Sequence, residues 1–174
     1  MSDETTDSPA DAPAWEVLDP TTAGRLRDET REFAMDVLQG LSERPKRLSS
    51  RWFYDARGSE LFAAIMDVPQ YYLTDCEHEI LESHGADITA LAADGPFNLV
   101  DLGAGDGRKT MKLLRHLEAA GADVTYVPID ISEQAMADVT ARVAEGFPRV
   151  PIRGIVAEYT DGLPWLHLTI KTRL

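Results

Sequence analysis

Three glycines stand at alternate positions after a short apolar run, in the segment Asp101-Leu-Gly103-Ala-Gly105-Asp-Gly107. Glycine lets the backbone pass close to a ligand, and a helix that begins behind such a loop offers unpaired N–H groups to an anionic group. The loop can therefore hold a small molecule that carries a carboxylate or a phosphate. The dinucleotide-binding pattern GxGxxG would need a glycine at position 108, where this chain has Arg108.

Polar side chains also follow two further apolar runs. Asp130 closes the run over 124–129, and Glu158 with Tyr159 follows the run over 152–157. An acid at the end of a second strand can accept hydrogen bonds from both ribose hydroxyls, although NAD-binding proteins share this feature. Ligands of parallel sheets bind at the carboxyl ends of the strands, so three polar strand ends predict one binding site. Ordinary turn glycines and strand-terminal acids are the alternative, and the agreement of three strand ends disfavours it.

The apolar runs alternate with amphipathic segments. Strands are expected over 97–102, 124–129 and 152–157, and helices over 108–120 and 133–145. Ser132 is a good N-cap for the second of these helices. Strands separated by helices of this length form a βαβαβ unit with a parallel sheet. The predicted fold class is therefore α/β, with half of a doubly wound sheet.

The part of the chain before this unit is predicted to be helical. Apolar side chains recur at helical intervals over about 21–40 and from Gly58 to Met66. Thr74 followed by Glu77 has the pattern of a capping box, which predicts the start of a third helix. The expected division is an acidic, disordered tail over 1–14, a helical cap over 15–95, a half-domain over 96–163 and an atypical tail over 164–174.

The composition narrows the choice of partners. With 17 Lys and Arg against 30 Asp and Glu, the formal net charge is −13, which disfavours nucleic acid and anionic membranes. No apolar run approaches the roughly 20 residues of a membrane span, and Met1 to Ala14 lack a basic signal-peptide region. The single cysteine, Cys76, excludes an internal disulfide and is compatible with a cytoplasmic location. The four histidines show no metal-ligand spacing, so no metal is expected.

The spacing of the glycine loop, DxGxGxG, resembles motif I of class I S-adenosylmethionine-dependent methyltransferases. That cofactor has an amino acid end and a ribose in place of a pyrophosphate. The resemblance implies that Asp101, Gly103 and Gly105 contact S-adenosylmethionine. It also implies adenine contacts from Glu158 and Tyr159, because methyltransferases commonly hold adenine after the third strand. The implied fold is a helical cap followed by an incomplete class I methyltransferase sheet, which is Rossmann-like.

A longer segment, RLSSRWFYDARGSELFAAIMDVPQYYLTDCEHEIL (47–81), is similar to the N-terminal signature of the histidine-specific Nα-methyltransferases. Enzymes of this family make trimethylhistidine (hercynine) in ergothioneine biosynthesis. The similarity continues through LVDLGAGDGRKT, VPID and GIVAEYTDGL. It implies that Tyr54 and Tyr71 bind the substrate, L-histidine or a related amine. It further implies that Lys109 and Asp130 bind the cofactor.

The implied reaction depends mainly on how the amine and the cofactor are positioned relative to each other. The sulfonium of the cofactor is already activated, so in-line attack by a neutral amine needs orientation more than acid or base groups. Tyrosine oxygens and ring faces can stabilise the methylated ammonium. No residue of this chain is assigned a certain catalytic role.

Members of the histidine-specific family are considerably longer than this chain, and the residues with which they bind the carboxylate and imidazole of histidine have no match in it. The strand over 97–102 is then expected to lack a partner at one edge, where Leu166, Leu168 and Ile170 could pair as a substitute strand. Three interpretations stay open. The chain acts as part of a parent protein or with a second chain that carries the missing half. It is a non-catalytic fragment that retains S-adenosylmethionine binding, or it methylates another amine.

Overall fold

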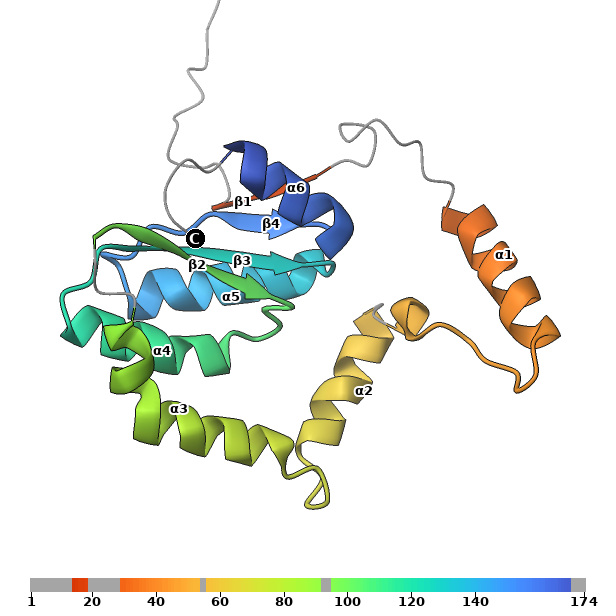
Figure 1. Cartoon of the computed structure of the whole chain (residues 1–174), viewed down its shortest axis with the longest axis horizontal. Coiled ribbons are helices and arrows are strands. Elements are labelled where there is room, and N and C mark those ends of the chain that lie inside the picture. The colour runs from red at the N-terminus through yellow and green to blue at the C-terminus, as the bar shows by residue number, and fades with distance from the viewer. Residues whose placement is uncertain (1–13, 19–28, 54–55, 92–94, 170–174) are drawn as a thin grey trace, which may run out of the picture.

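The computed structural model describes residues 14–18, 29–53, 56–91 and 95–169. Within these ranges, helices cover both faces of one four-stranded sheet, and further helices extend away from it (Figure 1). The strands are β1 (Trp15–Val17), β2 (Phe97–Leu102), β3 (Val124–Asp130) and β4 (Gly154–Val156). The helices are α1 (Glu29–Ser42), η1 (Ser50–Phe53), α2 (Ala56–Met66), α3 (Leu73–Ala90), α4 (Arg108–Ala119), α5 (Glu133–Gly146) and α6 (Tyr159–Thr169).

The sheet has the order β1-β4-β3-β2, and every pair of neighbouring strands is parallel. This confirms the predicted α/β class and places β2 at an edge. The sequence pattern does not predict β1, which lies at the start of the segment expected to be a helical cap. Its three residues pair with β4 from Trp15 opposite Gly154 to Val17 opposite Val156. A strand this short has no measurable periodicity, and residue 154 is a glycine that leaves room for the Trp15 side chain.

The two faces of the sheet bury different side chains because neighbouring residues of a strand point to opposite sides. On the face covered by α4 and α5, Tyr126 packs with Leu114 and Val139, all three fully buried. On the face covered by α6, Ile129 packs with Leu166. The helices expected over 108–120 and 133–145 are confirmed as α4 and α5. Ser132 caps α5 as predicted, since its hydroxyl accepts from the backbone N–H of Ala135 at 3.2 Å.

The helices before the sheet form an extended arm. Helix α3 lies along α4, whereas α2, η1 and α1 run away from the sheet (Figure 1). The helix expected from Gly58 to Met66 is confirmed as α2, which begins two residues earlier. The capping box expected at Thr74 is wrong: α3 begins at Leu73, and its N-cap residue Tyr72 is already helical, with no side-chain cap hydrogen bond. The first part of the helix expected over 21–40 lies outside the described residues.

The substitute strand expected near the C-terminus is also wrong, because Leu166 lies in α6. It is 1% exposed and packs against the sheet, which a helical turn achieves and an edge strand would not. Gly162 allows this close approach, since a Cβ there would stand 3.1 Å from Cγ2 of Ile129. Ile170 and the side chain of Leu168 lie outside the described residues. Among the described strands, β2 therefore has a neighbour on one side only.

Candidate active site

The loop after β2 brings the predicted glycines to the carboxyl edge of the sheet. Gly103, Gly105 and Gly107 have φ values of +74°, +53° and +70°, a left-handed backbone that favours glycine. The backbone N–H of Gly103 donates to the carbonyl of Ile129 at 2.8 Å, so the loop is fixed to the neighbouring strand β3. Gly107 ends the loop as the N-cap residue of α4.

The carboxylate of Asp130 joins this loop to the end of β3. Its Oδ2 accepts from the backbone N–H of Gly105, and its Oδ1 accepts from the backbone N–H of Ser132, both at 2.9 Å. Each carboxylate oxygen has two acceptor positions, so each keeps one for a ligand. Backbone donors on two sides fix the orientation of this half-buried group. A carboxylate held in this way can accept from two neighbouring hydroxyls.

The carboxylate of Asp101 lies beside the same loop and has side-chain partners. Oδ2 accepts from the hydroxyl of Tyr126 at 2.9 Å and from the hydroxyl of Thr110 at a shorter distance. Burial, together with the negative charge of Asp101, raises the pKa of Tyr126 far above its usual value, so this phenol stays protonated and donates. Sequence reasoning missed both hydroxyls. The register of β2 against β3 brings Tyr126 opposite Leu99, two residues before Asp101, and only the folded sheet reveals it.

The end of β4 brings Tyr159 to the glycine loop. A Cβ at Gly103 would stand 2.5 Å from the hydroxyl oxygen of Tyr159, so the phenol lies directly against the glycine. The neighbouring Glu158 reaches toward the arm, where its Oε1 lies 2.7 Å from Nη2 of Arg51 in η1. Arg51 also contacts Glu32 of α1 at 3.3 Å. The third strand end therefore meets both the glycine loop and the helical arm.

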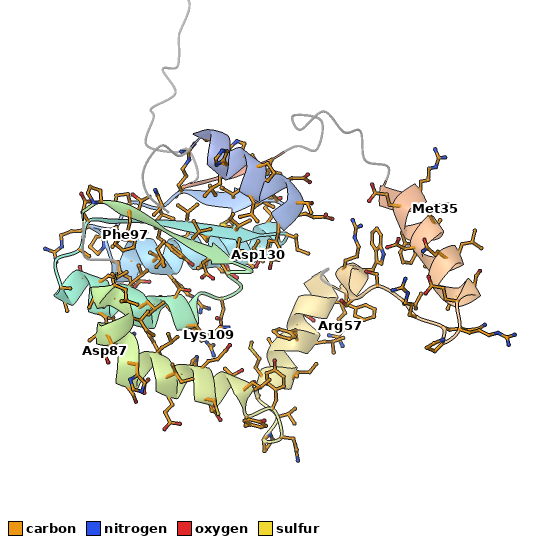
Figure 2. All side chains as sticks on the ribbon, viewed as in Figure 1. Met35, Arg57, Asp87, Phe97, Lys109 and Asp130 are labelled. Atoms are coloured by element: carbon orange, nitrogen blue, oxygen red, sulfur yellow. The ribbon has the colours of Figure 1, made fainter. Side chains whose placement is uncertain are left out.

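Lys109 connects the site with the arm at a second point. Its Nζ lies 3.0 Å from Oε2 of Glu77 in α3, and both side chains are about half exposed. Figure 2 shows Lys109 and Asp130 on the side of the α/β body that faces α2. An ammonium has three donors, so Lys109 can keep Glu77 and still bind a carboxylate.

The predicted substrate-side tyrosines are not brought together by the described part of the chain. Tyr71 lies between α2 and α3, where its half-buried ring packs edge-on against Phe62 with the ring centroids 6.5 Å apart. Tyr54 lies outside the described residues. The substrate role of both tyrosines therefore stays a prediction.

The chemistry at this edge favours some ligands over others. Asp101 and Asp130 lie beside the glycine loop, and such carboxylates attract hydroxyls and cations and repel a pyrophosphate. Within the described ranges, no cluster of three His, Cys, Asp or Glu side chains could hold a metal ion. No helix in those ranges is long and apolar enough to cross a membrane.

Comparison with known proteins places the chain among methyltransferases. A family model described as "Histidine-specific methyltransferase, SAM-dependent" matches residues 33–173, which include all of α6. The histidine N-alpha-methyltransferase of Mycobacterium tuberculosis is 34% identical over 146 residues, which cover 82% of this chain and 44% of that protein. The 4-dimethylallyltryptophan N-methyltransferase of Claviceps purpurea is 31% identical over 162 residues, which cover 92% of this chain and 46% of that protein.

A similar solved structure is the plantazolicin methyltransferase BpumL in complex with SAH (S-adenosylhomocysteine), with a TM-score of 0.44 and 14% identity. The match covers 76% of this chain and 44% of the other. The chain spans less than half the length of each of these proteins.

Proposed function

Because the chain belongs to the family of histidine-specific, S-adenosylmethionine-dependent methyltransferases, we propose that its sheet edge binds S-adenosylmethionine for methylation of the α-amine of L-histidine. The geometry of Asp130 carries the proposal. Gly105 and Ser132 hold its two oxygens from the backbone and leave one acceptor position on each. Two ribose hydroxyls on neighbouring carbons match this pair of acceptors.

The other residues at the edge fit the rest of the cofactor. A Cβ at Gly105 would meet no side chain within 4 Å, so the loop leaves room there for the amino acid end, whose carboxylate suits Lys109 at the start of α4. Tyr159, beside the loop, and Glu158 supply a ring face and an acceptor for adenine. When bound, the cofactor supplies an electrophilic methyl group on its sulfonium.

The arm supplies the substrate side of the proposed site. Tyr71 and Tyr54, which the family resemblance assigns to the amine, belong to the segment between β1 and β2, and residues 96–163 carry the cofactor contacts. A tyrosine hydroxyl can accept a hydrogen bond from the amine, and a tyrosine face can stabilise the ammonium formed after methylation. The ion pairs Arg51–Glu158 and Glu77–Lys109 support this arrangement because both link the arm to proposed cofactor contacts.

Catalysis by this scheme needs a further polypeptide segment beside β2, supplied by a longer protein or by a second chain. The edge of β2 borders a groove of about 420 Å³ between the strand and α6. Leu102 and Leu163 line it and are 47% and 44% exposed. An apolar groove next to a strand edge that has no neighbour among the described strands fits an added parallel strand with apolar side chains. Without such a segment, the chain is a non-catalytic binder of S-adenosylmethionine.

The single cysteine supports a reducing, cytoplasmic location.

A different amine is the second candidate substrate. The relative from Claviceps purpurea is named for 4-dimethylallyltryptophan and matches 92% of this chain, more than the histidine enzyme does. The matched residues are therefore shared with enzymes named for two different amines. This supports a common cofactor and a common methyl transfer, and it does not single out one substrate.

Calorimetric titration with S-adenosylhomocysteine tests the cofactor proposal. We expect binding by the unaltered chain and an affinity at least about tenfold lower in Asp130→Asn, since a charged acceptor is lost. Asp138→Asn is the matched control, because Asp138 is an exposed acid of α5 that accepts from Gln134. Absence of binding, or equal losses in both variants, would contradict the proposal.

Mass spectrometry of histidine and tryptophan derivatives then tests the substrate. The chain is incubated with S-adenosylmethionine alone and with the C-terminal part of the Mycobacterium tuberculosis relative. Methylated histidine formed only in the mixture supports the proposed completion of the sheet. Methylation of the tryptophan derivative in place of histidine supports the second candidate.

A further inference from the structure

Tyr126 has an unusual place for a tyrosine. It lies in the middle of β3, is 0% exposed, and packs in the apolar cluster of Leu114, Met136 and Val139. A phenylalanine would fill the same space without burying a polar atom. The hydroxyl avoids that cost because it donates to Oδ2 of Asp101 at 2.9 Å.

Thr110 reaches the same oxygen from another element. It lies in the first turn of α4, is 8% exposed, and donates its hydroxyl to Oδ2 of Asp101. Two hydroxyls, one from β3 and one from α4, therefore fill the two acceptor positions of one carboxylate oxygen. Among the described residues, no donor contacts the other oxygen, Oδ1, which is the one left for a ligand.

The charge of Asp101 indicates which ligand group it suits. The cofactor of the proposed function has hydroxyls, which suit Asp130, and a carboxylate, which suits Lys109. It also has an ammonium on its amino acid end. We assign that group to Asp101, because the carboxylate within the glycine loop, Asp106, contacts Arg108 through both of its oxygens. A carboxylate accepts a strong, charge-assisted hydrogen bond from an ammonium when its orientation is fixed beforehand.

We propose that Tyr126 and Thr110 are positioning residues that hold Oδ2 of Asp101 and so direct Oδ1 to the ammonium at the amino acid end of S-adenosylmethionine. This inference rests on the proposed function. Neither hydroxyl touches the ligand. Their loss therefore weakens recognition of one end of the cofactor and spares the adenosine end.

Two ligands separate these ends in a binding experiment. S-adenosylhomocysteine has the amino acid end, and 5′-methylthioadenosine has the same adenosine and thioether without it. In Tyr126→Phe we expect the affinity for S-adenosylhomocysteine to fall about tenfold and that for 5′-methylthioadenosine to change less than about twofold. Tyr72→Phe is the control, because the Tyr72 side chain is 64% exposed in this structure and should change neither.

Thr110 provides an independent pair of variants. Thr110→Val removes the hydroxyl and keeps the shape, so it should reproduce the selective loss, and Thr110→Ser should restore the affinity. Circular dichroism of each variant checks that it is folded.

Equal losses for both ligands, or no loss for S-adenosylhomocysteine in Tyr126→Phe and Thr110→Val, would overturn the inference. Failure of the unaltered chain to bind either ligand would contradict the proposed function and the inference with it. Binding by the unaltered chain with no selectivity in the variants would contradict the inference alone.

Discussion

Three glycines with nearly the same backbone allow a matched test of the site. Gly103, Gly107 and Gly121 have φ values of +74°, +70° and +69°. Alanine at any of them meets the same left-handed penalty of about 1–2 kcal/mol. The loss of chain entropy in the unfolded state offsets this by about 0.4–1 kcal/mol at each position. Differences among the three variants therefore report their surroundings.

The surroundings differ in what an added Cβ would meet. At Gly121 no heavy atom of the described structure lies within 4 Å. At Gly107 the Cβ would stand 2.4 Å from Cγ2 of Val139, a residue of α5 that is fully buried in the hydrophobic core. Crowding a packed core costs about 1–3 kcal/mol. We therefore expect Gly107→Ala to lower the free energy of unfolding by about 1–3 kcal/mol more than Gly121→Ala.

At Gly103 an added Cβ would meet only the end of a side chain that can move. The atom in the way is the hydroxyl oxygen of Tyr159, at the outer end of a side chain that is 46% exposed and can rotate. Gly103→Ala should therefore match Gly121→Ala in stability and still lose affinity for S-adenosylhomocysteine. Urea-induced unfolding followed by circular dichroism measures the stabilities, with an unchanged m value as the check on two-state behaviour. A Gly107→Ala variant within about 0.5 kcal/mol of Gly121→Ala would refute the close approach of the loop to α5.

The remaining predictions concern α6, the alkaline stability and the link to the arm. Leu166→Ala should lower the free energy of unfolding by about 2–5 kcal/mol, because Leu166 is buried. Leu163→Ala, at a side chain that is 44% exposed, should lower it by less than about 1 kcal/mol. Equal small losses would show that α6 is not packed on the sheet. Above about pH 10, the unfolded chain releases the Tyr126 proton, whereas the raised pKa of Tyr126 keeps that proton bound in the folded chain. The free energy of unfolding of the unaltered chain should therefore fall more steeply with rising pH than that of Tyr126→Phe. If the free energies of unfolding of the two proteins, measured in urea, fell in parallel above about pH 10, this prediction would be contradicted. Arg51→Gln should cost under about 1 kcal/mol, because the pair with Glu158 is about 40% exposed, and the cost should shrink in concentrated salt; a loss of several kcal/mol would mean a buried link.

The sheet and the glycine loop could be predicted because their signals are local. An apolar run, a polar residue at its end and an amphipathic segment recur within short stretches of sequence, and they give β2, β3, α4 and α5 with bounds close to those observed. The strand pairing follows from the general handedness of such units. The position of Asp130 beside Gly105 follows from the same topology.

Other features depend on contacts that no local pattern records. The leucine spacing near residue 166 is compatible with a strand and with a helix, and burial against β3 and β4 favours the helix. The capping box failed because the chain enters α3 with Tyr72 in a helical conformation, whereas a capping residue is normally extended. Arg51 and Glu158 are 107 positions apart, and the hydroxyl of Tyr126 finds Asp101 only through the strand register.

A crystal structure of the chain grown with S-adenosylhomocysteine would show where that ligand binds. We expect both ribose hydroxyls within hydrogen-bond distance of the Asp130 carboxylate, and the amino acid end against the backbone of the glycine loop at Gly103 and Gly105. A ligand bound elsewhere, or a ribose that makes no contact with Asp130, would contradict it.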